Sequence, residues 1–206
     1  MAYRTKAFVA AGCVVLAGLG AAMIGAGSQP TGAAPAKEGA VSADAYKIDS
    51  VHSSVIFRIR HMGVANFYGR FDSIAGTFAY DAGKPEGAQV DASIKVDSVH
   101  TGAGGRDSKI KTAQYFNAEK FSTITFKSTG AKSDGGKTTI TGDLTMMGVT
   151  KPVTATVTDS ATKGNAAGLE AVFTVKRSDF GMTANVADGS LGDEVQITVA
   201  LEGMKK

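Results

Sequence analysis

Three histidines are the side chains of this sequence best suited to proton transfer or metal binding. His52 and His61 fall within one predicted strand, and His100 precedes a glycine-rich segment. Because side chains alternate along a strand, the odd separation of His52 and His61 places them on opposite faces. No carboxylate stands at the HExxH spacing of a zinc site. We therefore interpret the histidines as hydrogen-bonded structural residues or residues at a pocket mouth, and we predict no metal.

Covalent catalysis requires an activated nucleophile, and the sequence offers few candidates. The single cysteine, Cys13, lies in an N-terminal apolar run, and residues 44–206 contain none. Serines are numerous, but the GxSxG motif of a nucleophile elbow is absent. We assign no catalytic residue and predict a protein that is not an enzyme, with an unrecognised hydrolase as an alternative.

Two segments could contact an anionic group. Residues 101–105, TGAGG, lead into a predicted helix with Arg106 and Lys109 near its start. Free N–H groups at such a turn can bind phosphate, although neither the Walker nor the dinucleotide fingerprint is present. Arg177 and Asp179 form the second candidate. They are interpreted as a structural ion pair or turn, with contact between Arg177 and a ligand head group as the alternative.

The elements that would position these residues are mainly strands. Residues 46–63 are predicted to form one long strand. Its side chains alternate between two faces, with Ile56 as the exception. One face carries Val55, Phe57, Ile59 and His61, and the other carries Ser54, Arg58 and Arg60.

About seven further strands follow, joined mainly by short glycine-rich turns. Alternating apolar residues mark them at Ile74, Phe78 and Tyr80; Val90 to Val96; Ile124 and Phe126; Thr138, Ile140 and Leu144; Val153 to Val157; Leu169 to Val175; and Val195 to Leu201. The sequence SDGG at residues 133–136 predicts a hairpin. Residues 106–117 are predicted to form one short helix, with Asp107 or Ser108 as its N-cap. We predict an all-β, antiparallel, eight-stranded barrel with one short helix, and a β-sandwich is the rival.

The N-terminal region is expected to lie outside this domain. A basic start with Arg4 and Lys6, followed by an apolar run, predicts a signal peptide over residues 1–27. Residues 28–43 form a Gly/Ala/Pro-rich linker or cleavage region, with cleavage sites after Ala36 and Ala43. An uncleaved anchor and a lipoprotein at Cys13 are the alternatives. The barrel domain is predicted to span residues 44–206, in a periplasmic or secreted protein.

Residues 44–206 carry 19 basic and 18 acidic side chains, a formal charge of +1. Without a basic run, this balance gives no electrostatic basis for binding nucleic acid. Without cysteine, the domain must be stable in an oxidising compartment without disulfides.

A series of short motifs runs in order through most of residues 46–202. They are Tyr46-Lys-Ile-Asp49 with His52-Ser53, Phe57 with His61-Met-Gly63, Gly69-Arg-Phe71, Arg106-Asp107 with Tyr115-Phe116, Ile124-Thr-Phe126, Gly142-Asp-Leu144 with Gly148-Val-Thr-Lys151, Arg177-Ser-Asp179-Phe-Gly181, and Asp193-Glu-Val195. In these motifs the chain resembles the YceI-like family of bacterial polyisoprenoid-binding proteins. It departs from the family at Lys109-Ile110, usually His-Leu, and at Phe121-Ser122, where a proline is usual.

This resemblance implies a lipocalin-like barrel, an elongated apolar pocket and a non-enzymatic periplasmic or secreted protein. The implied ligand is a long-chain isoprenoid, such as a quinone or polyprenyl phosphate, or a similar fatty amphiphile. We expect no other cofactor, and we expect transient membrane contact. The sequence leaves the oligomeric state open, with a dimer as the candidate. The alternative is a stress-associated structural or interaction barrel whose side chains fill the interior, since eight strands leave just enough room for them. The predicted ligand-binding residues are Val55, Phe57, Ile59, His61, Phe116, Phe126, Leu144, Phe173, Arg177 and Val195.

Overall fold

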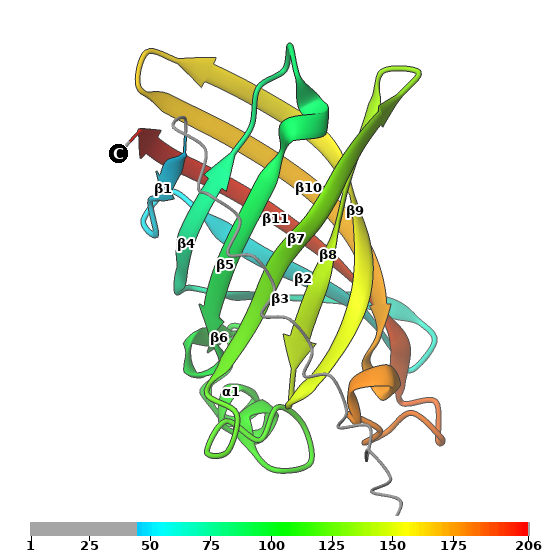
Figure 1. Cartoon of the computed structure of the whole chain (residues 1–206). Helices are drawn as coiled ribbons and strands as arrows, with labels where there is room; N and C mark the ends of the chain where they lie inside the picture. Colours follow the sequence, from blue (N-terminus) through cyan, green and yellow to red (C-terminus); the bar gives the residue numbers. More distant parts are fainter. Residues whose placement is uncertain (1–44, 206) are drawn as a thin grey trace, which may run out of the picture. The chain divides into compact units, whose positions relative to one another are not determined.

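Antiparallel strands make up most of the computed structural model, which describes residues 45–205 (Figure 1). The expected signal peptide (1–27) and linker (28–43) lie outside the described residues. The strands are β1 Tyr46–Ile48, β2 Ser54–His61, β3 Ala65–Phe71, β4 Ile74–Ala79, β5 Gln89–Lys95, β6 Val99–His100, β7 Thr123–Asp134, β8 Lys137–Met146, β9 Val149–Lys163, β10 Ala166–Lys176 and β11 Leu191–Lys205. One α-helix, α1 Gly104–Lys111, and three 3-10 turns, η1 Pro85–Gly87, η2 Val96–Ser98 and η3 Arg177–Phe180, complete the described elements.

Eight of these strands close into a barrel, in the order β1-β4-β5-β7-β8-β9-β10-β11. Closure depends on β1, which pairs with β4 on one side and with the C-terminal end of β11 on the other. A β-sandwich would leave two separate sheets with free edges, whereas here one sheet returns to its first strand. The predicted barrel is therefore confirmed. The hairpin predicted at residues 133–136 is also confirmed, since Asp134 pairs with Lys137 across Gly135 and Gly136.

The single strand predicted over residues 46–63 is wrong, because the chain turns between β1 and β2. Asp49 accepts hydrogen bonds from the Val51 backbone N–H and from His52 Nδ1, each at 2.8 Å. The Ser53 hydroxyl then bonds the backbone of Glu202, 149 residues further along the chain. These local bonds compete with the strand ladder, as Asp and Ser side chains commonly do. The break frees β2 to follow a different direction from β1.

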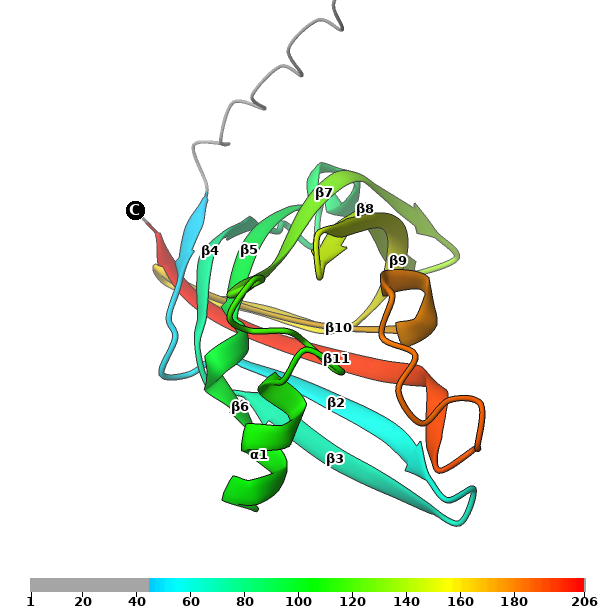
Figure 2. The same ribbon diagram turned by 90° about the horizontal axis from the view of Figure 1, so that it is seen from below.

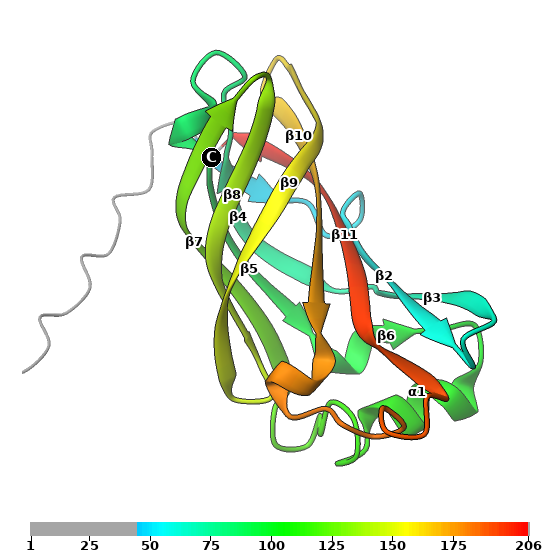
Figure 3. The ribbon, with the colours of Figure 1, turned by 90° about the vertical axis from the view of Figure 1, so that its right-hand side faces the viewer.

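The β2–β3 hairpin leaves the ring and extends beside the barrel (Figure 3). β2 pairs with β11 between Leu191 and Ala200, and β3 pairs with β2 along its whole length. Beyond β3, only Arg70 and Phe71 find a further partner, in β6. The sequence interpretation missed β3, since Gly69 interrupts its inward apolar row. The barrel is consequently tight where β1 closes it and open where β2 diverges.

The predicted helix over residues 106–117 is placed too far along the chain. α1 begins at Gly104, and Thr112 has extended backbone angles that end it. Asp107 lies inside the first turn and is not the N-cap, because Ala103 occupies that position. Residues 112–117 form successive turns, in which Ala113 is exposed. The spacing of three residues between Ile110, Ala113 and Phe116 therefore predicted a longer helix than the chain forms.

The closed end of the barrel has a packed interior. Tyr46 of β1 stacks on Phe78 of β4 with 5.4 Å between ring centroids. Phe78 is only 1% exposed, and Ile48 and Ala167 are buried in the same hydrophobic core. Aromatic stacking of this kind adds to the free energy that burial of the rings contributes. This core positions β1 and so holds the barrel closed.

Candidate functional site

The barrel encloses a cavity of about 530 Å³. Side chains do not fill the interior, so the packed-barrel alternative does not describe this structure. The wall is made by inward-facing residues of the strands, which alternate with outward-facing ones. Every closing strand except β1 contributes, as does β2. Residues of the wall include Val55, Phe57, Ile59, Val90, Ala92, Ile94, Ile124, Phe126, Ile140, Leu144, Met146, Ala155, Leu169, Ala171, Phe173, Val175, Val195, Ile197, Val199 and Leu201.

All ten side chains predicted to bind a ligand lie on this cavity. Eight of them belong to the strands, where alternation places them inward: Val55, Phe57, Ile59, His61, Phe126, Leu144, Phe173 and Val195. Phe116 reaches the cavity from the turns after α1, and Arg177 from η3 at the end of β10. Their contact with a ligand stays a prediction.

Two phenylalanines lie flat against the wall because glycines face them. Phe57 is opposite Gly69 on β3, and a Cβ on that glycine would lie 2.3 Å from the ring. A Cβ on Gly142 of β8 would likewise lie 2.5 Å from the ring of Phe126. Real Cβ atoms do not approach so closely, so any larger residue would push these rings from their positions. The glycines thus keep the rings along the wall and leave space beside them.

Polar residues line the end of the cavity near α1, which we call the mouth. Figure 2 shows the backbone of this end, with α1 and the start of β11 on the side from which the hairpin of β2 and β3 projects. The mouth is lined by His61, Phe67, Arg106, Lys109, Asn185 and Ser190. Because His61, Arg106, Lys109 and Asn185 are exposed, the cavity reaches solvent here. Sequence reasoning included only His61 of this set among the ligand-binding residues. The others come from α1, from the loop before β11 or from the unpredicted β3, and no periodicity identifies them.

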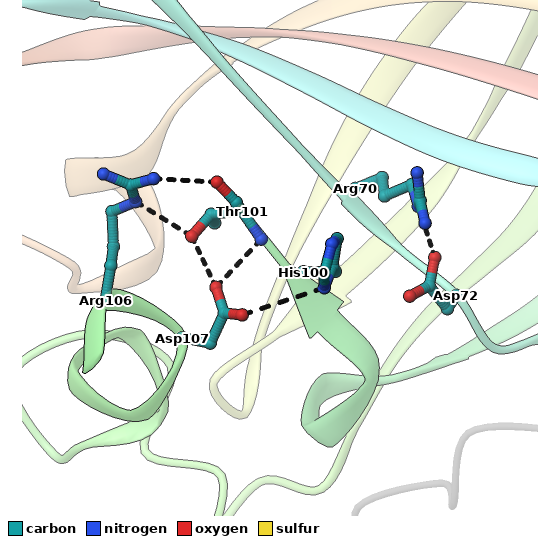
Figure 4. A network of polar contacts seen from close by, with 6 residues as sticks. All are labelled: Arg70, Asp72, His100, Thr101, Arg106 and Asp107. Atoms are coloured by element: carbon teal, nitrogen blue, oxygen red, sulfur yellow. Dashed lines mark hydrogen bonds and ion pairs between the residues drawn. The ribbon is translucent and has the colours of Figure 1, made fainter. Parts of the chain in front are cut away.

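A network of polar contacts fixes the start of α1 at the mouth (Figure 4). Asp107 accepts hydrogen bonds from the Thr101 hydroxyl and from the Thr101 backbone N–H, the latter at 2.8 Å. These bonds hold the pKa of Asp107 below its usual value. Arg106 donates to the Thr101 hydroxyl and carbonyl at 2.8 and 2.7 Å. Its guanidinium also stacks over Phe67 of β3, 4.2 Å from the ring centroid.

This network uses the groups that a phosphate site over residues 101–105 would need. Asp107 occupies the Thr101 backbone N–H and places a carboxylate at the start of α1. Two of the Arg106 donor nitrogens are directed at Thr101. The Asp107 carboxylate in the first turn of α1 also complements the helix dipole there, which weakens the attraction of this turn for a further anion. The arrangement favours a structural role for this turn.

Arg177 is buried beside the cavity, with 3% of its surface exposed. Its guanidinium donates to the carbonyl oxygens of Gly192, Leu191 and Met182 at 2.8, 3.2 and 3.4 Å. Burial lowers the pKa of this group. Of the two structural roles predicted for Arg177 and Asp179, ion pair or turn, the structure shows the turn, because both residues lie in η3. The salt bridges within residues 45–205 do not include this pair. Arg177 instead anchors residues 182–192 to the end of the barrel.

The same segment is tied to the turns after α1 by one side-chain hydrogen bond. The Tyr115 hydroxyl donates to Asn185 Oδ1 at 2.8 Å, and both residues line the cavity. Asn185 has a positive φ of 58°, which asparagine tolerates better than most residues. This contact closes part of the mouth between two loops.

The histidines occupy three different environments. His52 bonds Asp49 in the β1–β2 turn, which raises the pKa of His52 and lowers that of Asp49. His61 lies at the mouth, as one of the two interpretations predicted. His100 Nδ1 is 3.9 Å from Asp107 Oδ2. The adjacent Ser53 hydroxyl is bonded to the Glu202 backbone, so the His52–Asp49 pair is not accompanied by a serine bonded to the imidazole.

Two further features of residues 45–205 concern metal ligands and membrane-spanning helices. No group of three or more His, Cys, Asp or Glu side chains is placed there to hold a metal ion. In the same residues, no helix has the length and apolar character needed to cross a bilayer.

An antiparallel barrel around an apolar cavity with a polar mouth defines the class of lipocalin-like binding barrels. The model of the YceI-like domain matches residues 46–203, and the chain belongs to this family. Protein YceI of Salmonella arizonae is 37% identical over 175 residues, which cover 82% of this chain and 91% of that protein.

Solved structures share the fold. BcnA of Burkholderia cenocepacia is 25% identical with a TM-score of 0.69, over 76% of this chain and 99% of that one. The YceI protein of Campylobacter jejuni is 26% identical with a TM-score of 0.63, over 72% of this chain and 90% of that one. A polyisoprenoid binding domain from Saccharophagus degradans, implicated in plant cell wall breakdown, is 16% identical with a TM-score of 0.61, over 78% of this chain and 98% of that one. At that identity, the last similarity is one of fold.

Proposed function

We propose that this protein sequesters or carries a long-chain isoprenoid, such as a quinone or polyprenyl phosphate, or a similar amphiphile. The observation that carries the proposal is the apolar cavity of about 530 Å³, which opens at a polar mouth. Its volume falls within the range of about 300–1,000 Å³ that is typical of small-ligand sites. Membership of the YceI-like family supports an isoprenoid as the ligand. No covalent step is part of this function.

Burial of the ligand tail supplies enough free energy for binding. Each buried CH₂-sized group contributes about 0.8 kcal/mol, and a five-carbon isoprene unit therefore contributes about 4 kcal/mol. Two or three such units offset an association cost of about 4–15 kcal/mol. The tail would provide affinity along the strand residues of the wall, and the head group would lie at the mouth.

The mouth offers groups that suit a polar head group. Lys109 and His61 are exposed there, and Asn185 presents an amide. Arg177 has three of its donor directions occupied by carbonyl oxygens, so it acts mainly by holding the mouth loop in place. We assign head-group contact first to Lys109 and His61.

We place this function in the periplasm or outside the cell. The predicted signal peptide over residues 1–27 supports this location. A carrier there would shield an apolar tail from water between two membranes or between a membrane and an enzyme.

The proposal is tested by native mass spectrometry with lipid extraction of protein purified from the cells that produce it. We expect a co-purifying amphiphile in the wild-type protein. The variant Ala171→Phe places a ring in the cavity and should lose most of that ligand, since overfilling removes the space for the tail.

The matched control is Val172→Phe, one residue along the same strand. Val172 does not line the cavity, because neighbouring side chains of a strand face opposite sides. It should retain the ligand. Recovery of no amphiphile, together with no uptake of added polyprenyl lipids, would overturn the proposal. Equal retention by both variants would show that the ligand binds elsewhere.

The hydrolase alternative makes a different prediction. Turnover of ester substrates that is abolished by a single Ser or His substitution, with ligand retention unchanged, would favour it over a carrier.

A further inference from the structure

We propose that the tip of the β2–β3 hairpin docks this protein on an anionic lipid surface and presents the mouth to it. The biological purpose of docking rests on the proposed function, which is the transfer of a lipid, but binding to a lipid surface is measured separately from ligand binding. Three observations support docking: the turn of the hairpin is apolar and exposed, the charged residues of the hairpin are all basic, and the turn lies beside the mouth.

Exposed large apolar side chains are concentrated on this hairpin. Of the six that are exposed among residues 45–205, four belong to it: Ile56, Met62, Val64 and Tyr68. Met62 is 60% exposed and Val64 is 78% exposed, side by side at the tip. Isolated exposed apolar residues are common, but a cluster at one projecting turn indicates an interaction site.

The turn conformation makes Met62 unusual. The Val64 N–H donates to the His61 carbonyl at 3.0 Å, and Met62 and Gly63 between them both have positive φ, 54° and 65°. Asn-Gly is the preferred pair in such a turn, as in type I′ hairpins, because asparagine tolerates positive φ. The positive φ of Met62 therefore costs conformational free energy. Because the side chain is exposed, contacts within the protein do not offset this cost.

The β8–β9 hairpin provides an internal comparison. Met147 and Gly148 form the same pair there, with φ of 53° and 75°. Met147 is partly buried and packs against the hydrophobic core, so contacts within the protein account for its apolar side chain. No such packing covers Met62 in the described part of the chain. A surface outside the protein would provide the missing apolar contact.

The hairpin carries positive charge only. Residues 54–71 contain three arginines, Arg58, Arg60 and Arg70, and no acidic residue, in a domain whose formal charge is close to zero. Arg70 is paired with Asp72, whereas Arg60 bonds the Gly63 carbonyl and Asn66 at the tip. Arg106 and Lys109 of α1 add two cations at the mouth. Acidic groups on nearby elements are Asp107, Asp188, Asp193 and Glu194, and the first three are hydrogen-bonded to Thr101, Ser190 and Ser178.

The tip adjoins the mouth. His61, its last strand residue, lines the cavity and pairs with Leu191, and the Met62 N–H donates to the Ser190 carbonyl at 3.0 Å. Figures 2 and 3 both show the hairpin projecting from the barrel beside α1 and the start of β11. Insertion of Met62 and Val64 among lipid head groups would therefore bring the cavity opening to the bilayer surface. Basic side chains beside an apolar insertion are the usual combination for anionic membranes.

Co-sedimentation of the full chain with lipid vesicles tests the proposal. We expect binding to equimolar phosphatidylglycerol and phosphatidylcholine, weaker binding to phosphatidylcholine alone, and loss of binding as salt is raised. Val64→Asp should lower the partition coefficient at least about tenfold, because it removes one apolar insertion and adds repulsion. Arg58→Gln should lower it about fivefold.

Val51→Asp is the matched control, since Val51 is 82% exposed in the β1–β2 turn, at the other end of β2. It should bind vesicles as the wild-type protein does. Met62→Asn is a second variant with two opposed readouts: a higher melting temperature, because asparagine suits the turn, and weaker vesicle binding. Because all variants keep residues 1–44, any contribution of that region is common to them.

Three outcomes would overturn the proposal: no sedimentation with anionic vesicles, equal losses in Val64→Asp and Val51→Asp, or a Val64-dependent dimer in light scattering without vesicle binding. Failure of docking is distinguishable from failure of the proposed function. Val64→Asp should keep its co-purified ligand, whereas Ala171→Phe should lose the ligand and still bind vesicles.

Discussion

The two ends of this barrel are built from the same strands but hold their side chains in different ways. At the closed end, β1 pairs with both β4 and β11, and Tyr46 stacks on Phe78 in a packed core. At the mouth, β2 has turned away from β4, and loops held by polar contacts replace the missing strand pairing. The five residues between β1 and β2 separate the strand that closes the barrel from the strand that lines the mouth.

This difference indicates that stability and binding are assigned to separate parts of one sheet. Burial in the closed end supplies free energy of folding. Around the cavity, wall residues face the cavity on one side and contact fewer protein atoms there than residues of a packed core do. Substitutions at the closed end should therefore mainly lower the free energy of unfolding, and substitutions around the cavity should mainly weaken ligand binding.

The largest effect is expected for Phe78→Ala at the closed end. Removal of a fully buried ring that stacks on Tyr46 should lower the free energy of unfolding by about 3–5 kcal/mol. Phe173→Ala, on the cavity wall, should lower it by only about 1–2 kcal/mol, since its ring is partly buried beside a space that already exists. Urea denaturation measures both. Equal losses of unfolding free energy in the two variants would contradict the difference between the closed end and the cavity wall.

A smaller loss is expected for Arg177→Met at the mouth. The change leaves the carbonyl oxygens of Leu191 and Gly192 without their donor and should lower the free energy of unfolding by about 1–3 kcal/mol. Hydrogen exchange should become faster in residues 182–192 while β4 and β5 stay protected. Arg177→Lys should restore only part of the protection, because an ammonium group lacks the planar fork of donors. Uniformly faster exchange would show that the two ends are not independent.

Gly69→Ala tests whether glycine keeps the Phe57 ring on the wall. The new Cβ would displace the ring into the cavity, with an expected loss of about 1–2 kcal/mol of stability. Combination with Phe57→Leu should recover much of this loss, as a double-mutant cycle from denaturation curves would show. Additive effects of the two substitutions would contradict the proposed contact.

The smallest effect is expected for His52→Gln in the turn that separates the two ends. Its partner Asp49 raises the pKa of His52 above the ordinary 6.5, so this stabilisation is present below that pH and is lost as the pH rises through the raised pKa. The pKa of Asp49 is held below the ordinary 3.8, so its part is present above that value and is lost as the pH falls through the lowered pKa. The stability difference between wild type and variant should be largest near about pH 5 and smaller at about pH 8. A difference that does not vary with pH would show that the pair does not stabilise the turn.

Much of the barrel could be predicted from the sequence, and much of the mouth could not. Alternation along β5 and β10 placed their inward residues correctly, because a strand with one buried face has a strict period of two. β3 was missed since Gly69, an inward position, carries no side chain to mark that face. The break at Asp49 was missed because hydrogen bonds of Asp49 and Ser53, and not apolar periodicity, determine it.

The residues of the site divide in the same way between strands and loops. The cavity wall follows from strand alternation, so Phe57, Phe126 and Phe173 were placed on it correctly. Tyr115, Asn185 and Arg106 reach the mouth from loops or from the start of a short helix, where tertiary contacts decide the direction of a side chain. All three line the same cavity, and the hydrogen bond from Tyr115 to Asn185 joins residues that are far apart in the sequence.

Closure by β1 also has a consequence for the order of folding. Ile48 pairs with Gly203, so the ring cannot close until nearly the whole domain is available. Pairings of such long range are slow to form, and until then β1 and β11 present unpaired edges that other chains could join. A chain that emerges gradually, from a ribosome or through a membrane pore, would therefore pass through an open and association-prone sheet. Assistance by a chaperone would matter most in that interval.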